Sequence, residues 1–185
     1  IKRALYLAVC KDDDRLYTER VRFDEEAAEN LRDRGHRVAL ADRMPDPLSA
    51  DPSWYQCKWC PAHSFCHERQ LTEQVNCRTC AHVTPEKDGT WSCARWDAKD
   101  IPLEFQATGC DSHVLHPDMV PWPQKDSNDP HEAVYEIRGT DIRNGEGDAF
   151  TFSSKELIAG GESCANEDVQ AARAAFPGAV VEGVV

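Results

Sequence analysis

Seven of the nine cysteines in this chain lie between residues 57 and 110, in two clusters that each begin with a C-x2-C step. The first cluster is Cys57, Cys60 and Cys66, and the second is Cys77, Cys80, Cys93 and Cys110. Two cysteines separated by two residues can hold one metal ion from a single tight turn. The spacing therefore predicts metal binding by thiolates before it predicts disulfides.

The second cluster is complete in itself, because four thiolates satisfy either tetrahedral zinc or a cubane iron-sulfur cluster. Its spacing resembles that of high-potential iron-sulfur proteins, in which aromatic residues pack close to the cluster, and Trp91 and Trp96 flank Cys93. We expect a [4Fe-4S] cluster or zinc here, with a structural zinc staple as the plainest form. His82 and His113 could replace or orient a ligand, although such histidines are more often ordinary polar residues.

The first cluster has three cysteines and needs a fourth ligand. His63 would complete the regular spacing C-x2-C-x2-H-x2-C around zinc, whereas His67, adjacent to Cys66, is less well placed. Cys10 is another candidate, and so is a cysteine upstream of Ile1. Two cofactors are therefore open at this cluster: zinc with His63, or [4Fe-4S] with an upstream cysteine.

Length and composition agree with a metal-stabilised protein. The 185 residues allow one medium domain or two small ones, and a hydrophobic content of 41% is low for one large core. The sequence has no signal peptide and no apolar run near the roughly 18 residues that span a bilayer, so we expect a cytoplasmic protein without a membrane partner. In a reducing cytosol the thiols stay free for metal.

The net charge of −12 is concentrated in the tail, where residues 114–185 carry five Lys and Arg against thirteen Asp and Glu, for −8. Acidic surface repels phosphate, so any DNA contact is expected from the first half of the chain or from upstream sequence.

The hydrophobic pattern predicts an α+β fold with three parts. Residues 1–44 should form a hairpin from segments 3–9 and 16–23, then a helix from Asp24 to about Leu40. Residues 53–113 should be a loop-rich double cysteine module with one short helix at 67–74.

An acidic α+β tail at 131–185 should follow. We expect strands at 133–138 and 149–152 around an Asn144-Gly145 turn, a helix at 155–159 capped by Ser154, and a helix at 166–176.

Three segments of the first 66 residues carry a family resemblance: ALYLAVCKDDDRLYTERVRFD, DEEAAENL and WYQCKWCPAHSFC. They resemble the C-terminal end of phage RecB-like nucleases of the PD-(D/E)XK superfamily. In the iron-sulfur members of that group, three cysteines near this end join one far upstream to hold [4Fe-4S]. The resemblance implies that Cys57, Cys60 and Cys66 are cluster ligands that clamp the end of the nuclease fold to its beginning.

The family's catalytic residues do not carry over. Asp97-Ala98-Lys99 matches its acidic-x-Lys element in letters but lies in no apolar strand context, so the active site is expected before Ile1. We therefore expect a non-catalytic fragment of a DNA exonuclease, from a phage-infected or lysogenic bacterial host, that stabilises an upstream nuclease core and guides single-stranded DNA. The alternatives are an iron-sulfur electron-transfer or redox-sensing protein and a zinc-stapled protein-interaction module.

Overall fold

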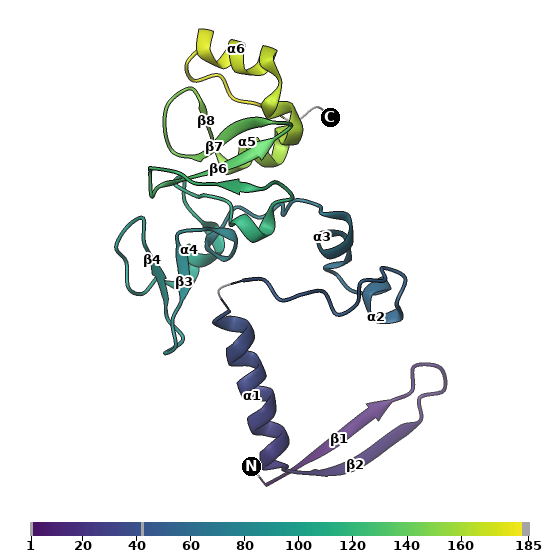
Figure 1. Cartoon of the computed structure of the whole chain (residues 1–185). Coiled ribbons are helices and arrows are strands. Elements are labelled where there is room, and N and C mark those ends of the chain that lie inside the picture. The colour runs from purple at the N-terminus through teal and green to yellow at the C-terminus, as the bar shows by residue number, and fades with distance from the viewer. Residues whose placement is uncertain (1, 42, 183–185) are drawn as a thin grey trace. The chain divides into compact units, whose positions relative to one another are not determined.

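The computed structural model describes residues 2–41 and 43–182, and the chain divides into two units, Ile1–Asp42 and Arg43–Val185 (Figure 1). Each unit contains both helices and strands, which confirms the predicted α+β class. Within the described residues, no helix is long and apolar enough to cross a membrane.

The first unit is a hairpin followed by one helix. Strands β1 (Arg3–Val9) and β2 (Leu16–Arg22) pair antiparallel, and helix α1 (Glu25–Ala39) follows. The Asp24 side chain caps α1 by accepting a hydrogen bond from the Ala27 amide at 3.0 Å. The β1–β2 pairing confirms the predicted hairpin. Gly35 lies inside the helix, which confirms the predicted continuation of the helix to about Leu40.

Apolar side chains of this unit face solvent on both sides of the hairpin. Leu5 and Leu7 are 71% and 57% exposed on one face, Tyr6 is 54% exposed on the other, and no residue of α1 is buried. A hairpin without a covered face is marginal in water, so this unit gains little stability from its own packing.

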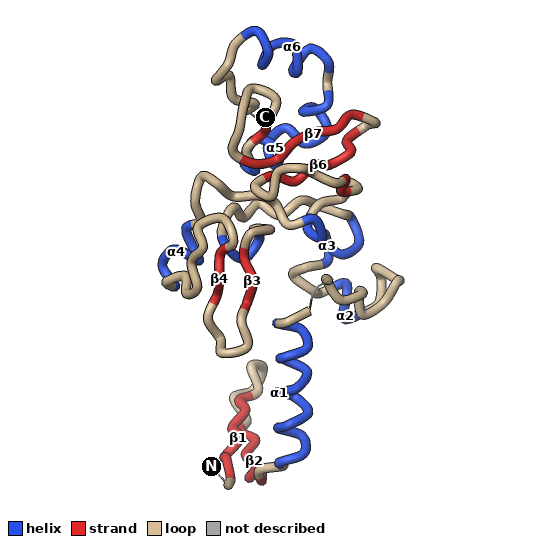
Figure 2. Tube along the Cα trace, turned by 60° about the vertical axis from the view of Figure 1, so that its left-hand side comes forward, coloured by secondary structure: helices blue, strands red, loops and turns tan. Residues whose placement is uncertain are grey.

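The C-terminal half of the second unit contains a four-stranded sheet in the order β5-β6-β7-β8 (Figures 1 and 2). Its strands are β5 (Gln124–Lys125), β6 (Glu132–Ile137), β7 (Thr140–Gly145) and β8 (Thr151–Phe152). β6 and β7 are antiparallel, whereas β8 runs parallel to β7. The β6–β7 turn is Arg138-Gly139, where φ is positive at both residues (51° and 79°), as a tight two-residue hairpin turn requires.

The predicted turn at Asn144-Gly145 is therefore wrong, because both residues belong to β7. Asn144 is fully buried, and its side-chain amide forms hydrogen bonds with backbone groups of two other segments. Its Oδ1 accepts from the Leu115 amide at 2.7 Å and its Nδ2 donates to the Phe152 carbonyl at 3.0 Å. Tertiary hydrogen bonds thus override a strong local turn signal.

One hydrophobic core lies under this sheet. Alternate residues of β6 point inward, and the buried set comprises Val114, Leu115, Ala133, Tyr135, Ile137, Ile142, Phe152, Leu157 and Cys164. Helix α5 (Ser154–Gly160), the short helix η3 (Gly161–Ala165) and α6 (Glu167–Ala175) follow the last strand. The cap of α5 is Ser153, one residue earlier than predicted, which leaves Ser154 inside the helix and buried.

A buried ion pair fixes the end of this region. Arg173 pairs with Glu156 and also donates to the Thr151 carbonyl at 2.8 Å and the Ala149 carbonyl at 2.9 Å. Removing one partner of such a buried pair typically costs about 3–5 kcal/mol.

The N-terminal half of the second unit consists of short elements joined by loops. They are α2 (Tyr55–Lys58), α3 (His63–Glu68), η1 (Cys77–Thr79), β3 (Val83–Pro85), β4 (Trp91–Cys93), α4 (Leu103–Thr108) and η2 (Pro117–Met119). The helix predicted at 67–74 is wrong in position, because α3 ends where Arg69 adopts a left-handed conformation with φ 53°.

Candidate metal centre

Three separate segments bring the second cysteine cluster together. Cys77 begins η1, Cys80 follows it and pairs in a β-bridge with Leu115, Cys93 ends β4, and Cys110 follows α4. Figure 2 shows the β3–β4 hairpin with α4 beside it. Cys80 and Cys93 are buried, Cys77 is half-buried and Cys110 is exposed.

Gly109 allows the segment of Cys110 to approach that of Cys77. Its φ is +69°, and a Cβ at this position would lie 2.5 Å from the Val75 carbonyl oxygen and 2.8 Å from the Asn76 Cα. Both are backbone atoms that cannot move aside cheaply. A glycine is therefore required here for conformation and for space.

The thiols of this cluster influence one another electrostatically. Burial raises the pKa of Cys77, and the nearby thiols of Cys80, Cys110 and Cys93 raise it further. Burial likewise raises the pKa of Cys80, while backbone hydrogen bonds from Val114 and His82 oppose that rise. Amides directed at a sulfur stabilise thiolate, which is the form that binds metal.

Three of these cysteines line a common cavity. Cys77, Cys93 and Cys110 share a space of about 270 Å³ with apolar neighbours that include Phe105 and Trp96. That volume is several times the roughly 30 Å³ that one water occupies in the liquid. The cavity thus has room for a group larger than one ion, next to a fourth thiol at Cys80.

All nine cysteines are free, and among residues 2–41 and 43–182 no group of three or more His, Cys, Asp or Glu side chains is already arranged to hold a metal. The donor set nevertheless fits a tetrathiolate centre, because three segments bring Cys80, Cys93 and Cys110 close enough to Cys77 to influence its thiol, and three of the four cysteines line one cavity. Ligation would require side-chain rotation and loss of the thiol protons.

His113 is the centre of a buried hydrogen-bond network next to this cluster. Its Nε2 lies 3.1 Å from both the Asn76 carbonyl and Thr79 Oγ1, and its Nδ1 lies 2.8 Å from Ser154 Oγ. Burial lowers the pKa of His113 to about 4. This neutral imidazole has protein partners on both nitrogens, so it positions the Cys77 turn rather than offering itself as a ligand.

His82 differs from His113, because its Nε2 is buried without a hydrogen-bond partner among the described residues. Burial lowers its pKa, and the charges of His131 and Arg95 lower it further. The neighbours that shape its titration are thus another imidazole and a guanidinium, not the cysteines.

The first cluster spans α2, the turn that follows it and α3, with Cys57 in α2, Cys60 in the turn and Cys66 in α3. Two successive turns join α2 to α3. In the first the Cys60 amide donates to the Cys57 carbonyl, and in the second the His63 amide donates to the Cys60 carbonyl, both at 3.0 Å. Cys57 is buried, whereas Cys60 and Cys66 are exposed. All three cysteines line a small cavity of about 70 Å³.

Two histidines line the same 70 Å³ cavity. His63 Nε2 lies 3.2 Å from the Pro52 carbonyl and its Nδ1 lies 3.7 Å from Glu68 Oε1. His67 has its Nε2 buried with no hydrogen-bond partner in the described part of the chain, and its ring centroid is 5.1 Å from that of His63.

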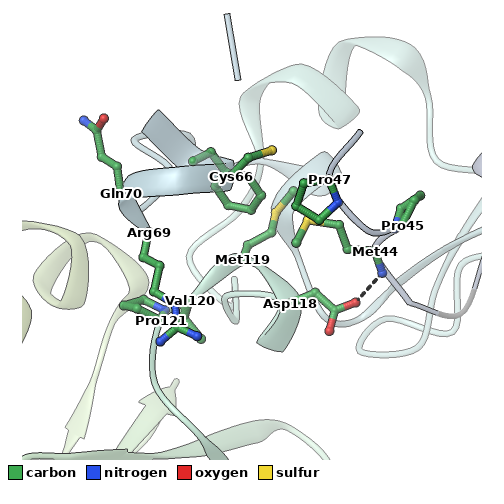
Figure 3. Close-up of a pocket in the computed structure, with 11 residues that line it drawn as sticks. Met44, Pro45, Pro47, Cys66, Arg69, Gln70, Asp118, Met119, Val120 and Pro121 are labelled. Atoms are coloured by element: carbon green, nitrogen blue, oxygen red, sulfur yellow. Dashed lines mark hydrogen bonds between the residues drawn. The ribbon is translucent and has the colours of Figure 1, made fainter. Parts of the chain in front are cut away.

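A second cavity, of about 240 Å³, adjoins Cys66 on another side (Figure 3). It lies between the end of α3 and the segments around Met44 and Asp118, and a 2.8 Å hydrogen bond joins the Met44 amide to the Asp118 carboxylate. Its remaining lining is mostly apolar, with Arg69 and Gln70 as the other polar side chains.

Three other residues with reactive side chains belong to neither cysteine cluster. Asp97 has φ 49° in the turn after β4, Cys10 lies in the hairpin of the first unit, and Cys164 is buried in the core, where burial raises its pKa to about 11. Sequence reasoning missed the roles of Asn144 and Ser154, since no motif marks a polar residue that replaces backbone hydrogen bonds.

Comparison of the chain with protein-family models, with curated proteins and with solved structures found no match in any of the three.

Proposed function

We propose that this chain is the metal-stapled, non-catalytic C-terminal region of a phage-type DNA nuclease. The observation that carries the metal-binding part is the approach of Cys77, Cys80, Cys93 and Cys110 from three segments, with Cys77, Cys93 and Cys110 lining one cavity. Bound metal would cross-link loops that bury few apolar side chains of their own.

The cavity size and its apolar lining favour an iron-sulfur cluster over zinc at this four-cysteine site. Such a cluster supplies either a structural cross-link or one-electron transfer, and its potential depends on burial and on hydrogen bonds to the sulfurs. Cys110 is exposed and Trp96 is 60% exposed at the cavity, which favours electron transfer as a second candidate function, because a redox partner could approach closely.

The link to a nuclease rests on the resemblance of residues 1–66 and on the exposed apolar faces of the first unit. A sheet-containing nuclease core would cover β1, β2 and α1, and so provide the burial that this unit lacks. Catalysis would belong to that core. We expect no DNA cleavage by this chain with magnesium or manganese, and robust cleavage would overturn the assignment.

Exposed tryptophans support a contact with single-stranded DNA. Trp59 is 80% exposed with the Lys58 ammonium 5.6 Å from its ring, and Arg95 lies 5.0 Å from the ring of Trp96. Bases stack on such rings with little sequence preference. Binding to an oligonucleotide that weakens with added salt would distinguish this role from that of a protein-interaction module.

Metal analysis tests the centre directly. The chain would be purified without oxygen and examined for iron, sulfide and zinc, together with its visible spectrum. Cys80→Ser should remove the metal of the four-cysteine site, while Cys164→Ser, the matched change of another buried cysteine, should not. A colourless protein with zinc alone would exclude the redox candidate, and unchanged metal content in Cys80→Ser would contradict the centre itself.

A further inference from the structure

We propose that His67 closes the first cysteine cluster into a site of three thiolates and one imidazole that binds a single zinc ion without any residue from outside the chain. The inference deepens the metal-binding part of the proposed function and rests on it. It replaces an undefined fourth ligand with a specific side chain.

The unpartnered nitrogen of His67 is the first argument. His67 Nε2 is buried, has no hydrogen-bond partner among the described residues, and belongs to a residue that lines the cavity of the three cysteines. Leaving a buried polar atom unsatisfied costs about 1–3 kcal/mol. A zinc ion in this cavity would accept the lone pair of that nitrogen and remove the penalty.

His63 provides the contrast. Its Nε2 lies 3.2 Å from the Pro52 carbonyl and its Nδ1 3.7 Å from the Glu68 carboxylate, so oxygen partners are present at both nitrogens. Ligation by His63 would disturb at least one of these contacts, whereas ligation by His67 would break none that the structure contains. The regular sequence spacing of His63 is thus outweighed by the existing partners of its ring.

The size and surroundings of the cavity favour one zinc ion. About 70 Å³ is close to the volume of two waters in the liquid, and far below the 270 Å³ at the second cluster. Three cysteines and one histidine are an established ligand set for structural zinc. Cys60 and Cys66 are exposed, so their thiols can rotate toward an ion held by buried Cys57.

The test uses the full chain, reduced and loaded with zinc chloride, in competition with a chelator. His67→Ala and the matched change His63→Ala alter neighbouring rings on the same helix. His63→Ala should leave zinc affinity unchanged, while His67→Ala should weaken one site by more than about 100-fold, which exceeds the roughly 10- to 100-fold effect of a group that only orients a ligand.

X-ray absorption at the zinc edge identifies the ligand atoms and is a second readout besides affinity. The wild-type site should show nitrogen at about 2.0–2.1 Å beside sulfur at about 2.3 Å. The nitrogen signal should persist in His63→Ala and vanish in His67→Gln, which keeps a polar side chain.

Three results would overturn the inference: unchanged zinc affinity in both His67 variants, loss of zinc in His63→Ala, or iron instead of zinc that disappears in Cys57→Ser. None of them bears on the four-cysteine centre, which Cys80→Ser probes separately. Failure of the inference is therefore distinguishable from failure of the proposed function.

Discussion

The buried imidazole of His113 should make the second unit sensitive to acid, and Gln at this position should remove that sensitivity. His113 is 2% exposed, and burial lowers its pKa to about 4 in the folded protein. In the unfolded chain a histidine titrates near 6.5. As the pH falls below that value, the unfolded state gains a proton that the folded state does not bind.

The sign and size of the effect follow from this difference. The stabilisation is complete above about pH 6.5, decreases as the pH falls, and stops changing below about pH 4. A difference of about 2.5 pKa units corresponds to about 3 kcal/mol, of which about 2.5 kcal/mol is lost by pH 4.5. At neutral pH, His113→Gln should also cost about 1–3 kcal/mol, because the contacts with Asn76 and Ser154 are disturbed.

Urea unfolding followed by tryptophan fluorescence measures this effect selectively, since all five tryptophans lie in the second unit. A chelator should be present throughout, so that metal release at low pH does not contribute. Between pH 7.5 and 4.5 the wild type should lose about 2.5 kcal/mol more than His113→Gln. His131→Gln, a change of a half-buried histidine, should retain the wild-type loss; parallel curves for wild type and His113→Gln would refute the reasoning.

Three further changes test the packing around the site. Gly109→Ala should destabilise the second unit by more than about 2 kcal/mol and weaken metal binding. The control Gly89→Ala, also at positive φ but with nothing within 4 Å of the added Cβ, should cost only about 1 kcal/mol; urea unfolding without chelator measures both. Asn144→Ala should cost about 2–4 kcal/mol, because buried backbone groups lose their partners, and Asn128→Ala on the surface should cost almost nothing in the same assay. Tyr135→Phe should lower the thermal midpoint modestly, through about 1 kcal/mol for its 2.6 Å bond to the Leu115 carbonyl; an unchanged midpoint would contradict that role.

The parts of the fold that the sequence predicts well are those determined by residues close together in the sequence. Asp24 caps α1 because an acceptor precedes two acidic residues and an apolar stripe, and the hairpin is specified by two apolar runs around a polar turn. The cysteine clusters are likewise visible from spacing alone, since their C-x2-C steps are local.

The wrong turn prediction lies where contacts between distant segments determine the local structure. Asn144-Gly145 has the composition of a turn, yet hydrogen bonds to Leu115 and Phe152 keep Asn144 in a strand. Sequence spacing predicts His63 as the fourth ligand, whereas our proposal of His67 uses the partners of each ring and the burial of a single nitrogen, which depend on how α3 packs. Neither property is encoded in a local pattern.

The distribution of buried side chains explains why metal should matter most in the cysteine-rich half. From residue 43 to 110 the buried apolar residues are Cys57, Cys80, Cys93 and Ile101, so three of these four are cysteines. The C-terminal sheet, in contrast, has its own aliphatic and aromatic core. These thiols are small and few larger apolar side chains are buried with them, so the loops of the cysteine-rich half gain little from apolar packing.

The network of His113, Ser154 and Asn144 connects these two halves, so it would transmit the effect of a bound metal from one to the other. Ser154 donates to the His113 carbonyl at 2.8 Å while its hydroxyl contacts the imidazole, and the imidazole reaches the Asn76 carbonyl beside Cys77. Metal at Cys77 would fix one end of this chain of contacts, and the packed core fixes the other. Because a half-satisfied buried network is costly, ordering of the cysteine turn and packing of the sheet should stabilise each other.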